Sequence, residues 1–191
     1  MNEKKLSIVF PIYNEEKSIK KIILEWKNEL DLFKIDYEII LAEDGSYDNT
    51  KNILFELIND DKNKIYLNNI VEKKRGYAGA LLSSVKIANG EFILCIDSDG
   101  QCNPKNFINF WNKKEFISEG IIIGNRKTRS DTLFRLIMSK LFLFIHRILF
   151  NSKIKDPSCP YVFCRKKTFL ELEKYLIYMV EWFLVGFCCS L

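Results

Sequence analysis

Two carboxylates separated by one serine follow an apolar run, because Asp97 and Asp99 come directly after Phe92–Ile96. In extended backbone the side chains at positions i and i+2 point the same way, so both carboxylates can face one spot. Two carboxylates so close together repel each other unless a cation lies between them. Mg²⁺ or Mn²⁺ suits such ligands, usually with phosphate oxygens and water, and Gln101 offers a further neutral oxygen. The alternative for an isolated Asp-x-Asp is a polar turn.

Polar residues also follow two earlier apolar runs. The run 6–10 leads into Tyr13–Glu15, and the run 37–42 leads into Glu43–Ser46. Carboxyl ends of parallel strands lie on one edge of a sheet, where such folds bind their ligands. We therefore expect the three polar strand ends to converge, which favours the metal interpretation of the aspartate pair over the turn.

The elements that must position these residues alternate between short apolar strands and amphipathic helices. We expect strands at 6–10, 37–42, 65–71, 91–96 and 119–124, and helices at 15–32, from 48 or 49 onward, at 76–88, from 104 onward and at 131–150. Asn14 is the expected cap of the first helix. The alternation predicts βαβ units, and hence an α/β fold with a Rossmann-like, mostly parallel sheet covered by helices on both faces.

Charge is unevenly distributed along the 191 residues, whose net charge is +4. Residues 126–174 contain twelve Lys and Arg against four Asp and Glu, a balance of +8, and the remainder has seventeen against twenty-one, a balance of −4. The basic half predicts an anionic partner such as a membrane surface or a phosphate. A nucleic acid is disfavoured, because the aromatic residues lie in apolar runs rather than on a stacking platform.

Cysteine and histidine usage argues against a zinc site. The chain has six cysteines without a C-x-x-C pair and one histidine, His146, which is too few ligands for a His/Cys centre. We interpret the cysteines as reduced thiols of a cytosolic protein.

Two apolar segments, 133–150 and 175–191, fall short of the roughly 20 residues of a membrane span. Helix 131–150 carries Arg135, His146 and Arg147 roughly along one side of an otherwise apolar surface, which fits a helix lying at a membrane interface. A core helix or a dimer contact is the alternative. The chain ends inside the second of these segments, so we expect it to be a piece of a longer protein.

Four motifs together resemble a known enzyme family. S-I-V-F-P-I-Y-N-E-E, E-D-G-S-Y-D-N-T, R-G-Y-A-G-A and A-N-G-E-F-I-L-C-I-D-S-D-G-Q resemble, in order and spacing, the family 2 glycosyltransferases of GT-A fold over residues 5–170. The D-x-D-x-Q form and the later basic stretch look like the polyprenyl-phosphate sugar transferases of the dolichol-phosphate mannosyltransferase type. The resemblance implies a GT-A catalytic domain at 1–170, followed by the apolar segment 171–191. It also implies peripheral attachment to the cytoplasmic face of a membrane, or integral attachment if a longer chain carries C-terminal helices.

The resemblance implies a nucleotide site at the first two strand ends. Pro11, Tyr13 and Glu15 fall where the family holds the nucleobase and ribose. Glu43 and Asp44 fall in its D-D-G-S turn near the nucleotide, with Glu43 in place of the usual aspartate. On local grounds alone, Glu15 is also explained as a first-turn helix glutamate, and Asp44 as part of an Asx turn.

The resemblance also implies roles for the later motifs. Asp97 and Asp99, with Gln101 as companion, match the motif for the metal and the diphosphate, and Ser98 between them is expected at the nucleotide sugar. Arg126 and Arg135 match arginines that bind the donor diphosphate and the acceptor phosphate, for which the planar guanidinium is suited. Asp156 either contacts a sugar or caps a turn.

The implied reaction is one inverting transfer of a hexose from a nucleoside-diphosphate sugar, such as UDP- or GDP-hexose, to a polyprenyl phosphate such as dolichyl or undecaprenyl phosphate. A lipid phosphate is already anionic near pH 7 and needs no strong base, whereas a sugar hydroxyl needs one, and no candidate base is evident. The alternatives are transfer to a sugar hydroxyl in surface glycan synthesis and a non-catalytic fragment that binds nucleotide sugars. The Q-x-x-R-W signature of processive synthases is absent from the sequence.

Overall fold

The computed structural model describes residues 5–68, 74, 76–116, 120–124, 133–150, 156 and 159–171. Within them one sheet has the strand order β3-β2-β1-β4-β6-β5. Its strands are β1 (Leu6–Ile12), β2 (Tyr37–Glu43), β3 (Ile65–Asn68), β4 (Phe92–Cys95), β5 (Ile121–Ile123) and β6 (Val162–Arg165). The α-helices are α1 (Ile19–Leu32), α2 (Thr50–Asp60), α3 (Gly76–Ile87), α4 (Phe107–Trp111), α5 (Leu133–Phe150) and α6 (Lys166–Glu171), and 3₁₀ turns lie at Pro104–Asn106 and Lys114–Phe116.

The expected α/β architecture is confirmed. β1 lies between β2 and β4 and is parallel to both, and β3 continues this parallel block beside β2. β6 is antiparallel to β4 and to β5, so the sheet is mixed at one end. The antiparallel arrangement makes β6 begin, rather than end, beside the carboxyl end of β4.

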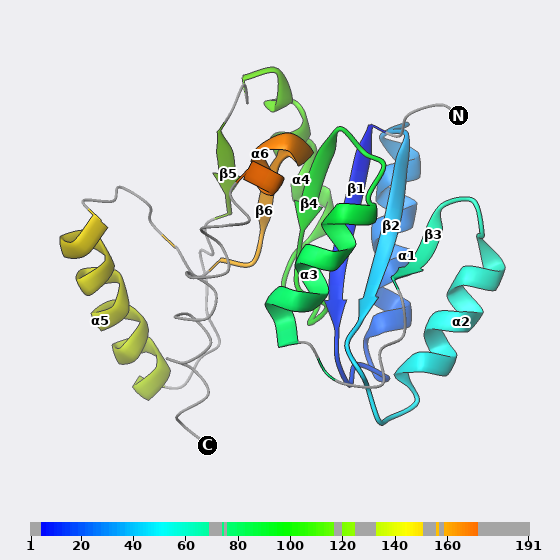
Figure 1. Cartoon of the computed structure of the whole chain (residues 1–191), viewed down its shortest axis with the longest axis horizontal. Coiled ribbons are helices and arrows are strands. Elements are labelled where there is room, and N and C mark those ends of the chain that lie inside the picture. Colours follow the sequence, from blue (N-terminus) through cyan, green and yellow to red (C-terminus); the bar gives the residue numbers. More distant parts are fainter. Residues whose placement is uncertain are drawn as a thin grey trace.

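Alternating strand residues build an apolar layer on each face of the sheet. Along β1, one layer receives Leu6, Ile8, Phe10 and Ile12, whereas the other receives Val9. The first layer contains Trp26 of α1 and Phe107 of α4, and the second contains Ala80 of α3 and Phe169 of α6. Figure 1 shows α3 in front of the sheet and α1 behind it. Both faces of the parallel block are therefore covered, as expected for buried parallel strands.

The first helix begins later than the sequence predicts. It starts at Ile19, and the residue at its N-cap position is Ser18 rather than Asn14. Asn14 has a left-handed backbone with φ of 57°, and its Oδ1 accepts a hydrogen bond from the backbone N–H of Tyr47 at 3.0 Å. The prediction that Asn14 caps α1 is therefore wrong, because its side chain instead joins the loops that follow β1 and β2.

A buried polar cluster fixes the opposite, amino-terminal edge of the sheet. The hydroxyl of Ser7 donates to Oε1 of Glu38 at 2.6 Å, and the backbone N–H of Gly90 donates to that hydroxyl at 2.8 Å. Asn89 binds Glu38 through its backbone and side-chain N–H groups. Buried polar groups need such partners, so this cluster holds β1, β2 and the α3–β4 turn in register.

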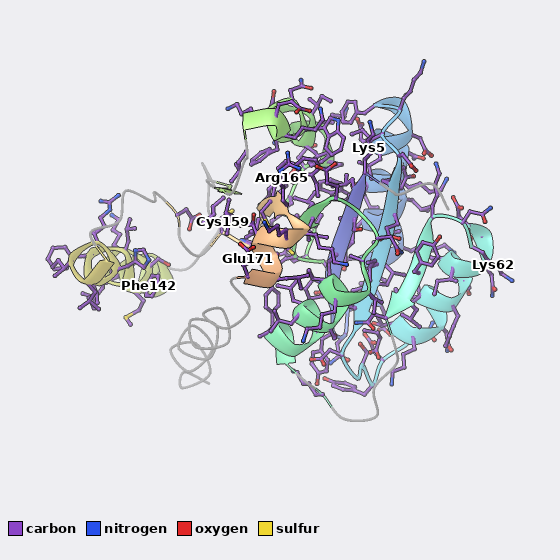
Figure 2. All side chains as sticks on the ribbon, turned by 45° about the horizontal axis from the view of Figure 1, so that its top comes forward. Lys5, Lys62, Phe142, Cys159, Arg165 and Glu171 are labelled. Carbon is purple, nitrogen blue, oxygen red and sulfur yellow. The ribbon has the colours of Figure 1, made fainter. Side chains whose placement is uncertain are left out.

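Helix α5 exposes large apolar side chains on several sides. These are Ile137, Met138, Leu141, Phe142, Phe144, Ile145, Ile148 and Leu149, all at least 37% exposed. In Figure 1 the helix stands apart from the sheet, and in Figure 2 side chains including Phe142 project around its axis. His146 is buried. None of the helices searched within the described residues, α5 included, has the length and hydropathy of a membrane span.

Candidate active site

The ends of β1 and β2 are joined by hydrogen bonds between their loops. The backbone N–H of Asn14 donates to Oγ of Ser46 at 2.9 Å, and that of Glu15 donates to Oγ1 of Thr50 at 2.9 Å. The arrowheads of both strands point to the same edge in Figure 1. The structure therefore brings the first two polar strand ends together, as the sequence predicts.

The third strand end joins them through Ser98. Its hydroxyl donates to the carbonyl oxygen of Pro11 at 2.9 Å, so this side chain points inward and is buried. On either side, Asp97 is half-buried and Asp99 is exposed. Burial thus alternates along these three residues, but the backbone bends at residues 98–100, so the extended backbone that the sequence interpretation assumed is not present there.

The residues after Asp99 form a tight turn. Oδ1 of Asp99 accepts a hydrogen bond from the backbone N–H of Gln101 at 3.0 Å, and Gly100 has a φ of 76°, which favours glycine. The turn anticipated as the plain alternative for Asp-x-Asp is thus present. It occupies one oxygen of Asp99, and the side chains of Asp99 and Gln101 remain exposed.

Tyr77, in the first turn of α3, lies against the aspartate pair. Its hydroxyl is hydrogen-bonded to the Asp97 carboxylate. Burial and, after it, the negative charge of Asp97 raise the pKa of Tyr77 well above its ordinary value. The hydroxyl therefore stays protonated and donates. The sequence interpretation missed Tyr77, because it expected a helix at 76–88 but assigned none of its residues to the site. The signal was an aromatic hydroxyl where a helix starts at the ligand-binding edge.

An aromatic surface lies at the ends of β1 and β2. The rings of Tyr13 and Tyr47 meet edge to face with centroids 6.1 Å apart, and both side chains are exposed. Nζ of Lys74 lies 3.5 Å from the centroid of the Tyr13 ring. Tyr47 and Lys74 were not predicted as site residues, since nothing in their local sequence shows which ring they contact.

The carboxylates at the end of β2 are both buried. One oxygen of Glu43 accepts a hydrogen bond from the backbone N–H of Ser46, while Oε2 is buried with no hydrogen-bond partner among the described residues. The backbone N–H of Asp44 donates a hydrogen bond to the carbonyl oxygen of Ile12 at 3.0 Å. Glu15 lies before α1, not in its first turn, and its Oε2 accepts from the hydroxyl of Ser18 at 2.6 Å.

The approach to β6 also reaches this edge. Val162 pairs with Cys95, so the residues before β6 lie beside the end of β4. Asp156 is buried, and its carbonyl oxygen accepts a hydrogen bond from the backbone N–H of Cys159 at 3.2 Å. Arg126 and the side chain of Arg135 lie outside the described residues, as does the segment 172–191.

The donor atoms at the end of β4 suit a hard divalent cation. Asp97, Asp99 and Gln101 offer oxygen ligands of the kind that Mg²⁺ and Mn²⁺ prefer. Among the residues that the structure describes, no group of three or more His, Cys, Asp or Glu side chains is placed to hold a metal. The set fits a cation that takes its remaining ligands from a bound phosphate and water.

Sequence comparison finds a matching family and relatives that are named as sugar transferases. The family model described as "Glycosyl transferase family 2" matches residues 7–172. The undecaprenyl-phosphate 4-deoxy-4-formamido-L-arabinose transferase of Yersinia pestis (strain Pestoides F) is 30% identical over 158 residues, 82% of this chain and 47% of the relative. The protein of that name from Photorhabdus laumondii is 31% identical over 138 residues, 72% and 42% of the two chains. The chain spans less than half the length of these relatives.

Solved structures share the fold. Glucosyl-3-phosphoglycerate synthase from Mycobacterium tuberculosis, in complex with Mn²⁺ and UDP-glucose, matches with a TM-score of 0.59 and 20% identity over 86% of this chain and 57% of that chain. Mannosyl-3-phosphoglycerate synthase from Rubrobacter xylanophilus gives a TM-score of 0.63 and 14% identity over 85% and 53%. The expected GT-A fold is confirmed.

Proposed function

The chain belongs to glycosyl transferase family 2, and from this premise we propose that it transfers a hexose from a nucleoside-diphosphate sugar to a polyprenyl phosphate, with inversion at the anomeric carbon. The observation that carries the proposal is the joining of three polar strand ends at one edge, with the carboxylate pair at the end of β4. The relatives named as undecaprenyl-phosphate sugar transferases support the lipid phosphate as acceptor.

A divalent cation, Mg²⁺ or Mn²⁺, would be held by Asp97, Asp99 and Gln101. When bound, it would supply positive charge to the diphosphate of the donor. The chain's own contribution is to hold these ligands in place. Oδ1 of Asp99 accepts a hydrogen bond from the backbone N–H of Gln101, and the hydroxyl of Ser98 anchors the backbone between the two carboxylates. The solved structure that contains Mn²⁺ with UDP-glucose supports this use of the fold.

The nucleotide would lie on the ends of β1 and β2, against Pro11, Tyr13 and Glu15. The exposed ring of Tyr13 offers a surface on which a base can stack. The buried Oε2 of Glu43 is an acceptor without a described partner, and the ring N–H of uracil or guanine is a donor that suits it. Asp44 would border the same nucleotide, and Asp156 would contact the sugar.

The acceptor would approach from the basic half of the chain. In this proposal Arg126 and Arg135 bind the donor diphosphate and the acceptor phosphate, because a planar, charged guanidinium group suits phosphate oxygens. The exposed apolar side chains of α5 support a helix that lies in the interface of a membrane with Lys140 and Arg147 near the headgroups. In this proposal residues 1–170 form the catalytic domain at the cytoplasmic face of the membrane.

The nucleophile in this proposal is an oxygen of the lipid phosphate. It attacks the anomeric carbon on the face opposite the nucleoside diphosphate, a carbon–oxygen bond forms, and the bond to the departing diphosphate breaks. Since that oxygen is already anionic near pH 7, the site needs no strong general base. Its tasks are to align the two phosphates and to offset their charge.

A donor screen followed by a transfer assay tests the proposal. UDP- and GDP-hexoses are first titrated calorimetrically with Mn²⁺ present. The best donor, radiolabelled in its sugar, is then offered to undecaprenyl phosphate in vesicles and to soluble oligosaccharides. We expect label in the lipid fraction. Label only in the oligosaccharides would support the sugar-hydroxyl alternative, and binding without turnover on any acceptor would support a non-catalytic fragment.

A further inference from the structure

The ring of Tyr13, on which the base is proposed to stack, is already in contact with an ammonium group. Nζ of Lys74 lies 3.5 Å from the centroid of that ring, which is the geometry of a cation–π contact. The side chains of both residues are exposed. A base that stacks on this face of Tyr13 must therefore displace the ammonium group of Lys74.

Lys74 differs from the other cations that lie over aromatic rings in the described part of the chain. Those cations are Lys64, Lys114 and Arg165, and each also forms an ion pair with a carboxylate, of Asp31, Glu115 and Glu91 respectively. Among the described residues, no carboxylate forms such a pair with Lys74. Because an exposed cation–π contact is weak, the ammonium group of Lys74 is available to an anionic ligand.

The position of Lys74 gives it access to both ends of the proposed donor site. It comes two residues before α3, which crosses from the end of β3 back to the start of β4, so it lies at the ligand-binding edge of the sheet. Its ammonium group is at Tyr13, which follows β1, and the neighbouring strand β4 leads into the aspartate pair. Neighbouring strands lie about 4.8 Å apart, a distance that the flexible four-carbon stem of lysine can span.

We propose that Lys74 exchanges the ring of Tyr13 for the diphosphate of the donor when the base stacks on that ring. The inference rests on the proposed placing of the nucleotide on Tyr13. A free nucleoside breaks the cation–π contact and offers the ammonium group no replacement. A nucleoside diphosphate replaces that contact with a stronger, charge-assisted one. Lys74 thus makes the site select nucleotides that carry a diphosphate over free nucleosides.

The substitution Lys74→Ala frees the ring and removes the charge, so the two ends of the nucleotide should respond in opposite directions. The probe pairs are uridine with UDP and guanosine with GDP, all in EDTA, and the pair that binds the wild type is used. Nuclear magnetic resonance titration measures the nucleoside and calorimetry the diphosphate. We expect nucleoside affinity to rise about threefold, as for an exposed cation–π contact that no longer has to be broken. Diphosphate affinity should fall about tenfold, because the lost hydrogen bond to a charged group outweighs that gain.

Two control variants accompany it. Lys74→Arg keeps a cation that can lie over a ring and bind phosphate. Lys114→Ala removes a lysine from the ring of Trp111, which contacts Phe92 at the start of β4 and hence at the opposite edge of the sheet. We expect both controls to bind the two probes like the wild type, and the melting temperature of each variant shows that it is folded.

The possible outcomes separate the exchange from the site on which it rests. If nucleoside affinity in Lys74→Ala stays unchanged or falls, the exchange is overturned, since the lysine then does not compete with the base. If both affinities rise, Lys74 merely covers the ring, and the exchange is overturned as well. The variant Tyr13→Ala tests the base contact itself. If it binds the diphosphate probe like the wild type, the proposed placing of the nucleotide and this inference fail together.

Discussion

The hydroxyl of Ser98 donates a 2.9 Å hydrogen bond to the carbonyl oxygen of Pro11. Because β4 and β1 are parallel neighbours, this bond fastens the loop with the proposed metal ligands to the strand end proposed to hold the nucleotide. The two halves of the candidate donor site are thus connected by a side chain that is itself buried.

Removing that hydroxyl should loosen the connection. Ser98→Ala loses one buried hydrogen bond and is expected to lower the free energy of unfolding by about 1 kcal/mol, measured by urea denaturation. UDP affinity with Mn²⁺ should fall as well. Ser7→Ala is the control, because the buried hydroxyl of Ser7 donates to Glu38 at the opposite edge of the sheet, so its loss should lower stability without lowering UDP affinity. Unchanged stability and unchanged affinity in Ser98→Ala would show that the bond has no such role.

The turn and the charge of Asp99 can be separated. Asparagine keeps an Oδ1 that can accept the hydrogen bond from the N–H of Gln101, and it is common in such turns. The free energy of unfolding of Asp99→Asn should therefore stay within about 0.5 kcal/mol of the wild-type value. Most of the Mn²⁺-dependent activity should nevertheless be lost. Melting curves and transfer assays over a range of Mn²⁺ concentrations test this. Wild-type activity at low Mn²⁺ in Asp99→Asn would remove Asp99 from the metal site.

Glu43 offers a test of the nucleobase contact. Glu43→Gln keeps one oxygen for the N–H of Ser46 and can replace the buried Oε2 with an NH₂ group, which repels a donor on the base. We expect UDP affinity to fall about tenfold, in line with the cost of about 1–3 kcal/mol for a mispaired buried group. The control Glu16→Gln is exposed and accepts from Asn49. Calorimetry in EDTA measures UDP affinity without the metal, so a change reports on the nucleobase rather than on the diphosphate and its cation. Equal UDP affinity in Glu43→Gln and Glu16→Gln would exclude the contact between Glu43 and the base.

The amino-terminal edge gives a prediction on stability alone. A Cβ at Gly90 would lie 2.4 Å from the backbone nitrogen of Ser7, whereas a Cβ at Gly120 would meet nothing within 4 Å. Gly90→Ala should cost at least about 1–3 kcal/mol, the usual penalty for overpacking, and Gly120→Ala should cost little. Chemical denaturation of the two variants compares them directly, and similar midpoints would contradict the packing described for Ser7 and Glu38.

The sequence predicted the strands of the parallel block and the meeting of their polar ends, because apolar runs and turn residues are local signals. It did not predict where α1 begins. The reason is that Asn14 has the composition of a helix cap, yet its side chain bonds Tyr47 in the next βα unit. It also did not predict that β6 runs antiparallel beside β4, a pairing between residues about 70 apart in the chain.

Tyr77 shows why part of the site lay beyond sequence reasoning. The residues around it are small, and one of them, Ala80, is buried against β-strand residues. The contact of Tyr77 with Asp97 depends on the crossover that puts the start of α3 beside the end of β4. Lys74 and Tyr47 likewise acquire their partner, Tyr13, only through the fold.

The central claim, a lipid phosphate as acceptor, is tested most directly by a pair of acceptors that differ only in the phosphate. Undecaprenyl phosphate and undecaprenol are placed in identical vesicles with the wild-type protein, Mn²⁺ and the radiolabelled donor found in the screen. The account predicts label in the lipid fraction with undecaprenyl phosphate, none with undecaprenol, and none in the Asp99→Ala variant. Equal labelling of both lipids, or full Mn²⁺-dependent transfer by Asp99→Ala, would contradict it.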